Sequence, residues 1–168
     1  MLLLETFYFF IPAYVANMAP VIAKKLNLPF DKPLNKKKLG KNKTYRGLIF
    51  GYLAALLTVY LQKIYLIDGF NLIDYSQENI FIPSFLMTLG ALGGDALKSY
   101  FKRKKGIQSG QPWFPFDQID LILGAIICTL PFYKLPLIEI LFILIITPFL
   151  HFATNFISYK LKIKDVWW

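Results

Sequence analysis

The chain has 168 residues, a formal net charge of +9 and a hydrophobic share of 56%. Its length excludes more than one compact domain, and a mean hydropathy of +0.48 excludes an ordinary water-soluble surface and indicates a membrane protein. The positive charge suits anionic lipid headgroups or a polyphosphate as partner, and we expect no nucleic-acid partner.

Five apolar runs follow one another along the chain, at about 2–23, 47–67, 80–97, 118–134 and 136–160. A helix of about 20 residues crosses a hydrocarbon core of roughly 30 Å, and most of the runs reach or approach that length. The fourth run lies at the short end of the range. Aromatic residues, which form belts at membrane interfaces, crowd the ends of the runs. The sequence therefore predicts an all-α integral membrane protein with five transmembrane helices.

The basic residues predict the orientation of these helices. Of the 19 Lys and Arg residues, nine lie in 24–46, five in 98–105 and three in the C-terminal tail. The segment 68–79 has acidic residues and no basic residue. Basic loops stay in the cytoplasm, so we expect the N-terminus outside and the C-terminus in the cytoplasm. The prediction is a single domain, 1–168, in the cell membrane, with cytoplasmic loops at 24–46 and 98–117.

No secretory signal peptide is expected, because Glu5 stands where a cationic segment would precede the apolar run.

Three acidic residues lie at the inner ends of two apolar runs. Asp95 ends the third run, Asp117 opens the fourth, and Asp120 follows one helical turn later. A charged residue deep in a membrane costs roughly 2.5 to 3.5 kcal/mol and needs a partner. Asp117 and Asp120 share a helix face and repel each other unless a cation lies between them. A divalent cation such as Mg²⁺, which prefers oxygen ligands, is the simplest neutraliser. Two simpler alternatives are Asp117 as the N-cap of the fourth helix and Asp95 as the partner of a nearby amide.

The first basic loop has the features of an anion-binding site. It runs PFDKPLNKKKLGKNKTYRG and ends with Lys43, Thr44 and Arg46 at the mouth of the second run. Backbone amides beside basic side chains bind anions, and a helix N-terminus adds partial positive charge. The loop is not a Walker loop, because Asn35 and Asn42 stand where that pattern needs Gly and Ser or Thr. The alternative role is orientation and contact with lipid headgroups.

Three further polar residues fall at the same inner depth. Asn17 lies about 15 residues into the first run, and His151 and Asn155 share a face of the fifth run at i, i+4 spacing. Interhelical hydrogen bonding is the alternative to a role in substrate binding.

Four separated motifs carry a family resemblance. Gly94-Asp95, Ser99, Lys102-Arg103 and the run 117–120 resemble the G-D-x3-S-x2-K-R and D-R-x-D signature of the CDP-diglyceride synthetases, which are membrane cytidylyltransferases. Gln118 replaces the closing arginine. That change, the KLGKNKTYR turn, the short chain and the His151-containing tail are similar to the archaeal branch, the CDP-archaeol synthases. The bacterial Lys-Asp and His-Gly-Gly motifs are absent, so their roles are not transferred.

The resemblance implies a reaction. CTP and 2,3-bis-O-(geranylgeranyl)-sn-glycerol 1-phosphate, an isoprenoid ether-lipid phosphate, give CDP-archaeol and pyrophosphate at a site facing the cytoplasm. Positioning and charge neutralisation are the main demands of such a transfer. The lipid phosphate is already an anion, so no general base is required.

The resemblance also implies roles for individual residues. The catalytic metal ligands for Mg²⁺ are Asp95 and Asp117, with Asp120 as a third ligand or a partner of the ligands. Lys43 and Arg46 are expected on the CTP triphosphate and Lys102 and Arg103 on the lipid phosphate, and Ser99 and Thr44 are expected to add hydroxyl contacts to the substrates. Further candidate contacts to the substrates are Asp31, Asn17, His151 and Asn155. Cytosine selection is expected from Asp31, Asn35 and Asn42 or from 108–111.

Other functional classes predict other patterns. A small transporter or channel with an inner acidic site would show broken helices or an internal repeat. A phosphatidyltransferase of the CDP-alcohol type would carry a D-G-x2-A-R motif, which the sequence lacks. A scaffold would not need three acids beside so many cations.

Overall fold

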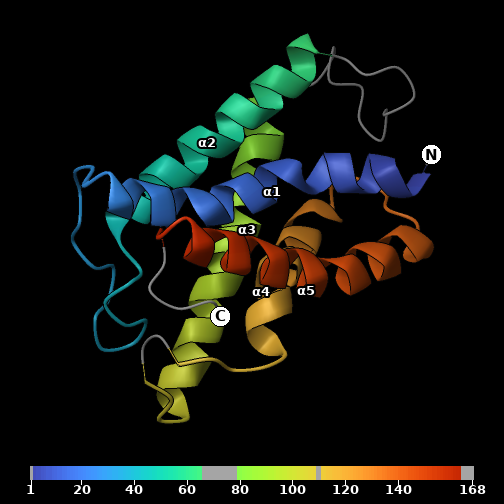
Figure 1. Cartoon of the computed structure of the whole chain (residues 1–168). Coiled ribbons are helices and arrows are strands. Elements are labelled where there is room, and N and C mark those ends of the chain that lie inside the picture. Colours follow the sequence, from blue (N-terminus) through green and yellow to red (C-terminus); the bar gives the residue numbers. More distant parts are fainter. Residues whose placement is uncertain (1, 66–78, 109–110, 164–168) are drawn as a thin grey trace.

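The computed structural model describes residues 2–65, 79–108 and 111–163. Within them the chain forms five helices and no sheet strand (Figure 1): α1 (Leu2–Lys25), α2 (Tyr45–Ile64), α3 (Phe81–Lys104), α4 (Phe116–Thr129) and α5 (Leu137–Lys160). Three of these helices are long and apolar enough to cross a membrane, over Leu3–Lys25, Tyr45–Ile64 and Leu137–Lys160. The all-α class is therefore confirmed for the described residues, and the predictions of five spans and of their orientation stay predictions.

Two helices differ in length from the predicted runs. α3 continues to Lys104, well beyond the expected end at residue 97, and α4 has only 14 residues. Lysine and arginine are good helix formers, so the basic run extends α3 rather than ending it. The helix ends at Lys104, and Gly106 turns the chain away with a φ of 74°, while the amide of Ile107 donates to the carbonyl of Lys102 at 2.9 Å. The basic residues after Asp95 are consequently held on a rigid helix.

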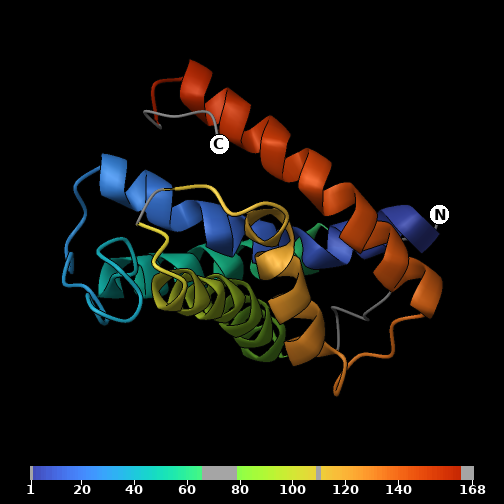
Figure 2. The same ribbon diagram turned by 90° about the horizontal axis from the view of Figure 1, so that it is seen from below.

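The helices pack around α1, which contacts each of the other four. Figures 1 and 2 show α3 passing across α1 and α2, with α4 along one side of α3 and α5 beside α1. The central core combines aromatic residues of α1 with smaller apolar residues of α3 and α4. Its fully buried members include Phe9, Phe10, Met87, Ala91, Ile122 and Ala125. This core therefore fixes α3 and α4 relative to each other.

Glycines bring α3 and α4 into backbone contact. A Cβ added at Gly90 would lie 2.5 Å from the Cα of Ala125, and one added at Gly94 would overlap the carbonyl oxygen of Asp120. Small residues allow helices to approach this closely in membranes. The contact places the turn after Gly94 directly against the first turns of α4.

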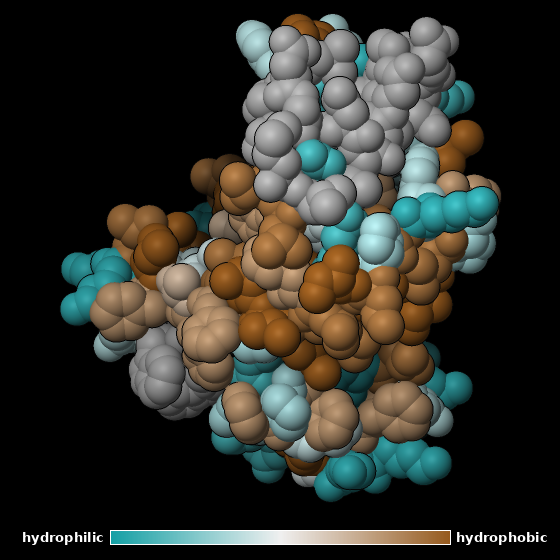
Figure 3. All heavy atoms as spheres, turned by 90° about the vertical axis from the view of Figure 1, so that its right-hand side faces the viewer, coloured by the Kyte–Doolittle hydropathy of each residue, from teal (hydrophilic) through white to brown (hydrophobic). Residues whose placement is uncertain are grey.

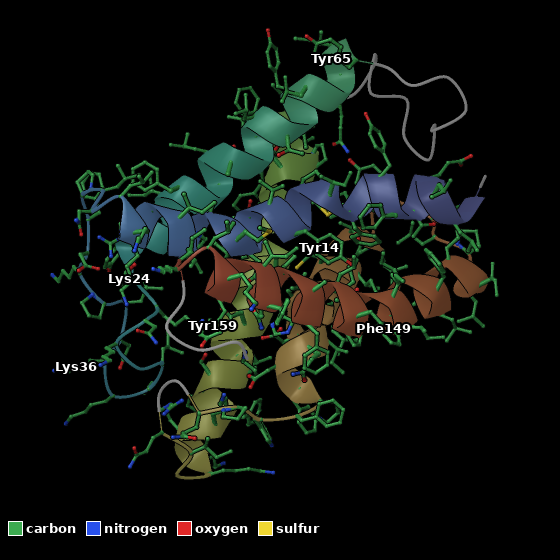
Figure 4. All side chains as sticks on the ribbon, viewed as in Figure 1. Tyr14, Lys24, Lys36, Tyr65, Phe149 and Tyr159 are labelled. Carbon is green, nitrogen blue, oxygen red and sulfur yellow. The ribbon has the colours of Figure 1, made fainter. Side chains whose placement is uncertain are left out.

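The outer surface is apolar, as expected for helices that face lipid. Leu57, Ile127, Ile145 and Phe149 are all more than half exposed. Apolar side chains cover the middle of the face in Figure 3, and hydrophilic side chains gather along its lower edge. Between α1 and α5, Tyr14 shares a hydrogen bond of 2.6 Å with Thr147, and Figure 4 shows Tyr14 in this interface.

Candidate active site

The three predicted acidic residues meet around one lysine of α3. The Nζ atom of Lys98 lies 3.1 Å from Oδ1 of Asp95, 2.8 Å from Oδ1 of Asp117 and 2.7 Å from Oδ2 of Asp120. Asp95 and Lys98 share a face of α3 at i, i+3 spacing, and the other two acids share a face of α4. The predicted convergence of the three carboxylates is therefore observed.

Lys98 itself was absent from the predicted site. In the sequence it is one of the five basic residues in 98–105, which as a group indicate only the orientation of the helices. The available signal was its spacing, because it stands three residues after Asp95 and four before Lys102.

Two further lysines complete the arrangement. Lys43, at the end of the first loop, forms an ion pair with Oδ2 of Asp95. Lys102 donates to both carboxylate oxygens of Asp117 at 3.1 Å and also to the carbonyl oxygen of Gln111. These six side chains form the carboxylate–lysine cluster: Asp95, Asp117, Asp120, Lys43, Lys98 and Lys102. Three carboxylates face three ammonium groups, so the charges in the cluster balance.

The N-terminus of α4 orients two of the acids. Asp117 lies inside the first turn, and its Oδ2 accepts a hydrogen bond of 2.5 Å from the amide of Trp113. The N-cap position belongs to Pro115, without a side-chain cap, so the alternative in which Asp117 is the N-cap is wrong. Asp120 is more deeply buried, and its Oδ1 accepts from the amide of Leu121 at 2.7 Å. Both acids therefore project towards α3 with one oxygen already held.

The first loop presents Lys43 through a set of internal bonds. The buried guanidinium of Arg46 donates to the carbonyl oxygen of Leu28 at 2.9 Å and to Asp31 at 2.5 Å. Thr44 is the N-cap of α2, and its hydroxyl accepts from the amide of Gly47 at 3.2 Å. Arg46 and Thr44 thus shape the loop, whereas both were predicted to contact the substrates. That contact stays a prediction.

The remaining predicted residues lie on α1, α3 and α5. Ser99 is buried on α3, and Arg103 has a buried Nε without a hydrogen-bond partner in the described part of the chain. Asn17 is half-buried on α1. His151 and Asn155 contact each other at 3.2 Å on α5, which packs on α1 and α4 and, among described residues, not on α3.

The residues proposed to read cytosine are exposed. Asn35, Asn42, Gln108 and Gln111 all lie at the surface, whereas 109–110 fall outside the described residues. The amide oxygen of Asn35 accepts from the backbone of Lys38 at 2.9 Å, which shapes the loop.

A shallow hollow of about 420 Å³ lies between the first loop and α3. Its α3 wall is formed by Gly93, Ala96, Leu97 and Tyr100. At 100° per residue these positions lie on the opposite face of the helix from the carboxylate–lysine cluster. The hollow is therefore separate from the charged centre.

The three carboxylates suit a hard divalent cation that keeps water or phosphate oxygens as most of its ligands. All three acids provide oxygen, which Mg²⁺ prefers, and Mg²⁺ commonly takes only one or two carboxylates together with water and phosphate oxygens. In the described ranges no three His, Cys, Asp or Glu side chains stand as a ready-made metal cage. The acids point at ammonium groups instead, so Mg²⁺ fits as a partner shared with a phosphorylated substrate.

Comparisons with known proteins identify the family of the chain. A family model described as "CarS-like: CDP-archaeol synthase" matches residues 1–168. The CDP-archaeol synthase of Methanocaldococcus jannaschii is 37% identical over 175 residues, covering 99% of this chain and 98% of the relative. The CDP-archaeol synthase of Pyrococcus furiosus is 34% identical, with 99% and 98% covered.

A solved structure has the same fold. It is described as an intramembrane enzyme for archaeal membrane lipid biosynthesis and superposes with a TM-score of 0.75 at 26% identity, covering 91% of this chain and 94% of that one. Together with the full-length family match, this shows that the chain belongs to the CDP-archaeol synthase family.

Proposed function

We propose that this chain transfers the cytidylyl group of CTP to an isoprenoid ether-lipid phosphate, giving CDP-archaeol and pyrophosphate. The observation that carries this proposal is the carboxylate–lysine cluster formed by the C-terminal half of α3 and the first turns of α4, beside a basic loop. A centre of balanced charges on rigid helices is suited to binding a polyphosphate together with its cation.

In the proposed reaction, an oxygen of the lipid phosphate attacks the α-phosphorus of CTP. The new bond joins that oxygen to the α-phosphorus, and the bond from the α-phosphorus to the bridging oxygen of the β-phosphate breaks, so that pyrophosphate leaves. The attacking oxygen is already anionic, and therefore the chain need not supply a base. Its task is to hold two negatively charged substrates against each other.

Asp95 and Asp117 are the proposed ligands of Mg²⁺, because they lie at the more exposed rim of the cluster. Their side chains are 19% and 14% exposed, against 7% for Asp120. When bound, the ion neutralises negative charge on the phosphates. Carboxylates held by a divalent ion no longer require the lysines beside them. Lys43 is then free to bind the triphosphate from the loop side, and Lys102 to bind the lipid phosphate from the α3 side.

Other groups have proposed supporting roles. Arg103, whose Nε has no hydrogen-bond partner among the residues that the structure describes, is the second candidate for the lipid phosphate. Arg46 acts on the triphosphate through the loop that it holds together with Asp31. Ser99 and Thr44 add hydroxyl groups, and the polar residues Asn17, His151 and Asn155 remain candidate substrate contacts.

The proposed topology has five membrane spans, with the active site facing the cytoplasm. Lys24 and Lys36 lie on one side of the molecule in Figure 4, at the end of α1 and in the first loop. Basic segments at one membrane side indicate the cytoplasmic face.

The decisive experiment is transfer of radiolabel from α-labelled CTP into a chloroform-soluble product by purified protein with Mg²⁺ and the lipid phosphate. UTP, ATP and dCTP are compared in parallel. We expect labelled lipid with CTP and less with UTP and ATP. Equal rates with all four nucleotides, or no labelled lipid with any, would contradict the proposal.

A further inference from the structure

We infer that Lys98 is a permanent cation of the reaction centre, in the place where a second divalent ion would otherwise sit, so that the site takes one divalent cation. This inference rests on the proposed function, since it concerns how the same centre balances charge. Lys98 is a positioning residue that lies outside both the defined positions of the family motif and the predicted site.

The position of the ammonium group is the first reason. Lys98 is the only residue in the described part of the chain that forms ion pairs with all three acids. Its side chain is 14% exposed, which leaves little room for an additional hydrated ion at the same point. A cation placed between three carboxylates does the electrostatic work of a metal ion there.

The unequal partners of the acids are the second reason. Asp95 is also paired with Lys43, and Asp117 with Lys102 and the amide of Trp113. Oδ2 of Asp120, in contrast, forms an ion pair with Lys98 alone and accepts no hydrogen bond of normal geometry from the described residues. A divalent ion at the rim can therefore replace the lysines on Asp95 and Asp117, while Asp120 still needs Lys98.

The position of Lys98 on α3 favours an ammonium group that stays beside Asp120. It lies one turn after Asp95 on the same helix, and its side chain is nearly as buried as that of Asp120. Moving the ammonium away would leave the buried carboxylate of Asp120 without compensation, which is strongly unfavourable. Asp120 is accordingly the partner of Lys98 rather than a direct ligand of the divalent ion.

The test measures Mn²⁺ binding to purified, substrate-free protein by electron paramagnetic resonance, alongside turnover with Mg²⁺. We expect wild type to bind one Mn²⁺ per chain. Lys98→Met removes a competing positive charge at hydrogen-bond distance from the same two carboxylate groups, so Mn²⁺ should bind at least about tenfold more tightly while turnover falls. Lys98→Arg should keep the wild-type affinity.

The matched control is Lys104→Met, the same chemical change at an exposed position on the same helix. It should change neither Mn²⁺ binding nor turnover. Two Mn²⁺ ions per wild-type chain, or unaltered affinity in Lys98→Met, would overturn the inference. The Mn²⁺ measurements need no substrate, so they fail or succeed independently of the proposed transfer reaction.

A second variant covers the case in which Lys98→Met is unstable without metal. The double variant Lys98→Met/Asp120→Asn removes both charges of the deepest pair. We expect it to fold in chelator and to bind Mn²⁺ closer to wild type than Lys98→Met does, because the two sites are coupled. If Asp120→Asn has the same effect on Mn²⁺ affinity with and without Lys98, the pairing is wrong.

Discussion

Replacing Gly90 by alanine tests whether the contact between α3 and α4 sets the geometry of the cluster. The added Cβ would lie 2.5 Å from the Cα of Ala125 and from the carbonyl oxygen of Gly124. Carbon atoms in contact sit about 3.5 to 4 Å apart, so α4 must retreat by about 1 Å. No charged or polar side chain is removed by this change.

The retreat of α4 separates the acids of that helix from Lys98 on α3. A misplacement of about 1 Å can reduce a catalysed rate by about 100-fold, and we expect a loss of that size in kcat/KM for Gly90→Ala. Overpacking of a tight contact costs roughly 1 to 3 kcal/mol, so Tm in detergent should also fall. The assays are radiolabel transfer from CTP and thermal unfolding.

Gly93→Ala is the matched control, because an added Cβ at this position meets no atom within 4 Å. Alanine is the better helix former by roughly 0.5 to 1 kcal/mol, so stability should hold or rise while turnover stays unchanged. Wild-type turnover in Gly90→Ala would refute the reasoning. An equal loss in Gly93→Ala would show that backbone freedom of α3, and not its packing, is what matters.

The other predictions concern the charged groups and the topology. Asp95→Asn and Asp117→Asn should each abolish turnover while the folded protein remains extractable, and normal activity of either at saturating Mg²⁺ would contradict the metal assignment. Arg46→Ala releases the loop and should raise the KM for CTP by roughly 10- to 150-fold, as expected for lost hydrogen bonds to a charged group, with little change in the KM for the lipid. Equal increases in the KM values for CTP and for the lipid would contradict this role of Arg46. Arg103→Ala should show the reverse pattern. A cysteine introduced at Lys37 should resist a membrane-impermeant thiol reagent in intact cells, and labelling from outside would reverse the orientation.

Local patterns in the sequence were sufficient to predict the all-α class and to identify three acidic residues of the site. Apolar runs and charge spacing act over a few residues, and they identified Asp95, Asp117 and Asp120 as acids on two helices, although Asp95 lies inside α3 and not at its end. The motifs also indicated the family, and the full-length match confirms it. These features are readable because helix periodicity and motif spacing depend on neighbours in the chain.

The partners of those residues depended on the tertiary structure. Lys98 reaches acids of α4 only because α3 continues as a helix past Asp95 and glycine lets the two backbones touch. Arg46 was expected at the triphosphate, yet it bonds to Asp31 and to a loop carbonyl. Sequence spacing specifies which residues share a helix face, but contacts between helices depend on how backbones approach and which side chains are buried together. For that reason the sequence identified the three acids of the site, and the packing of α3 against α4 decided which cations pair with them.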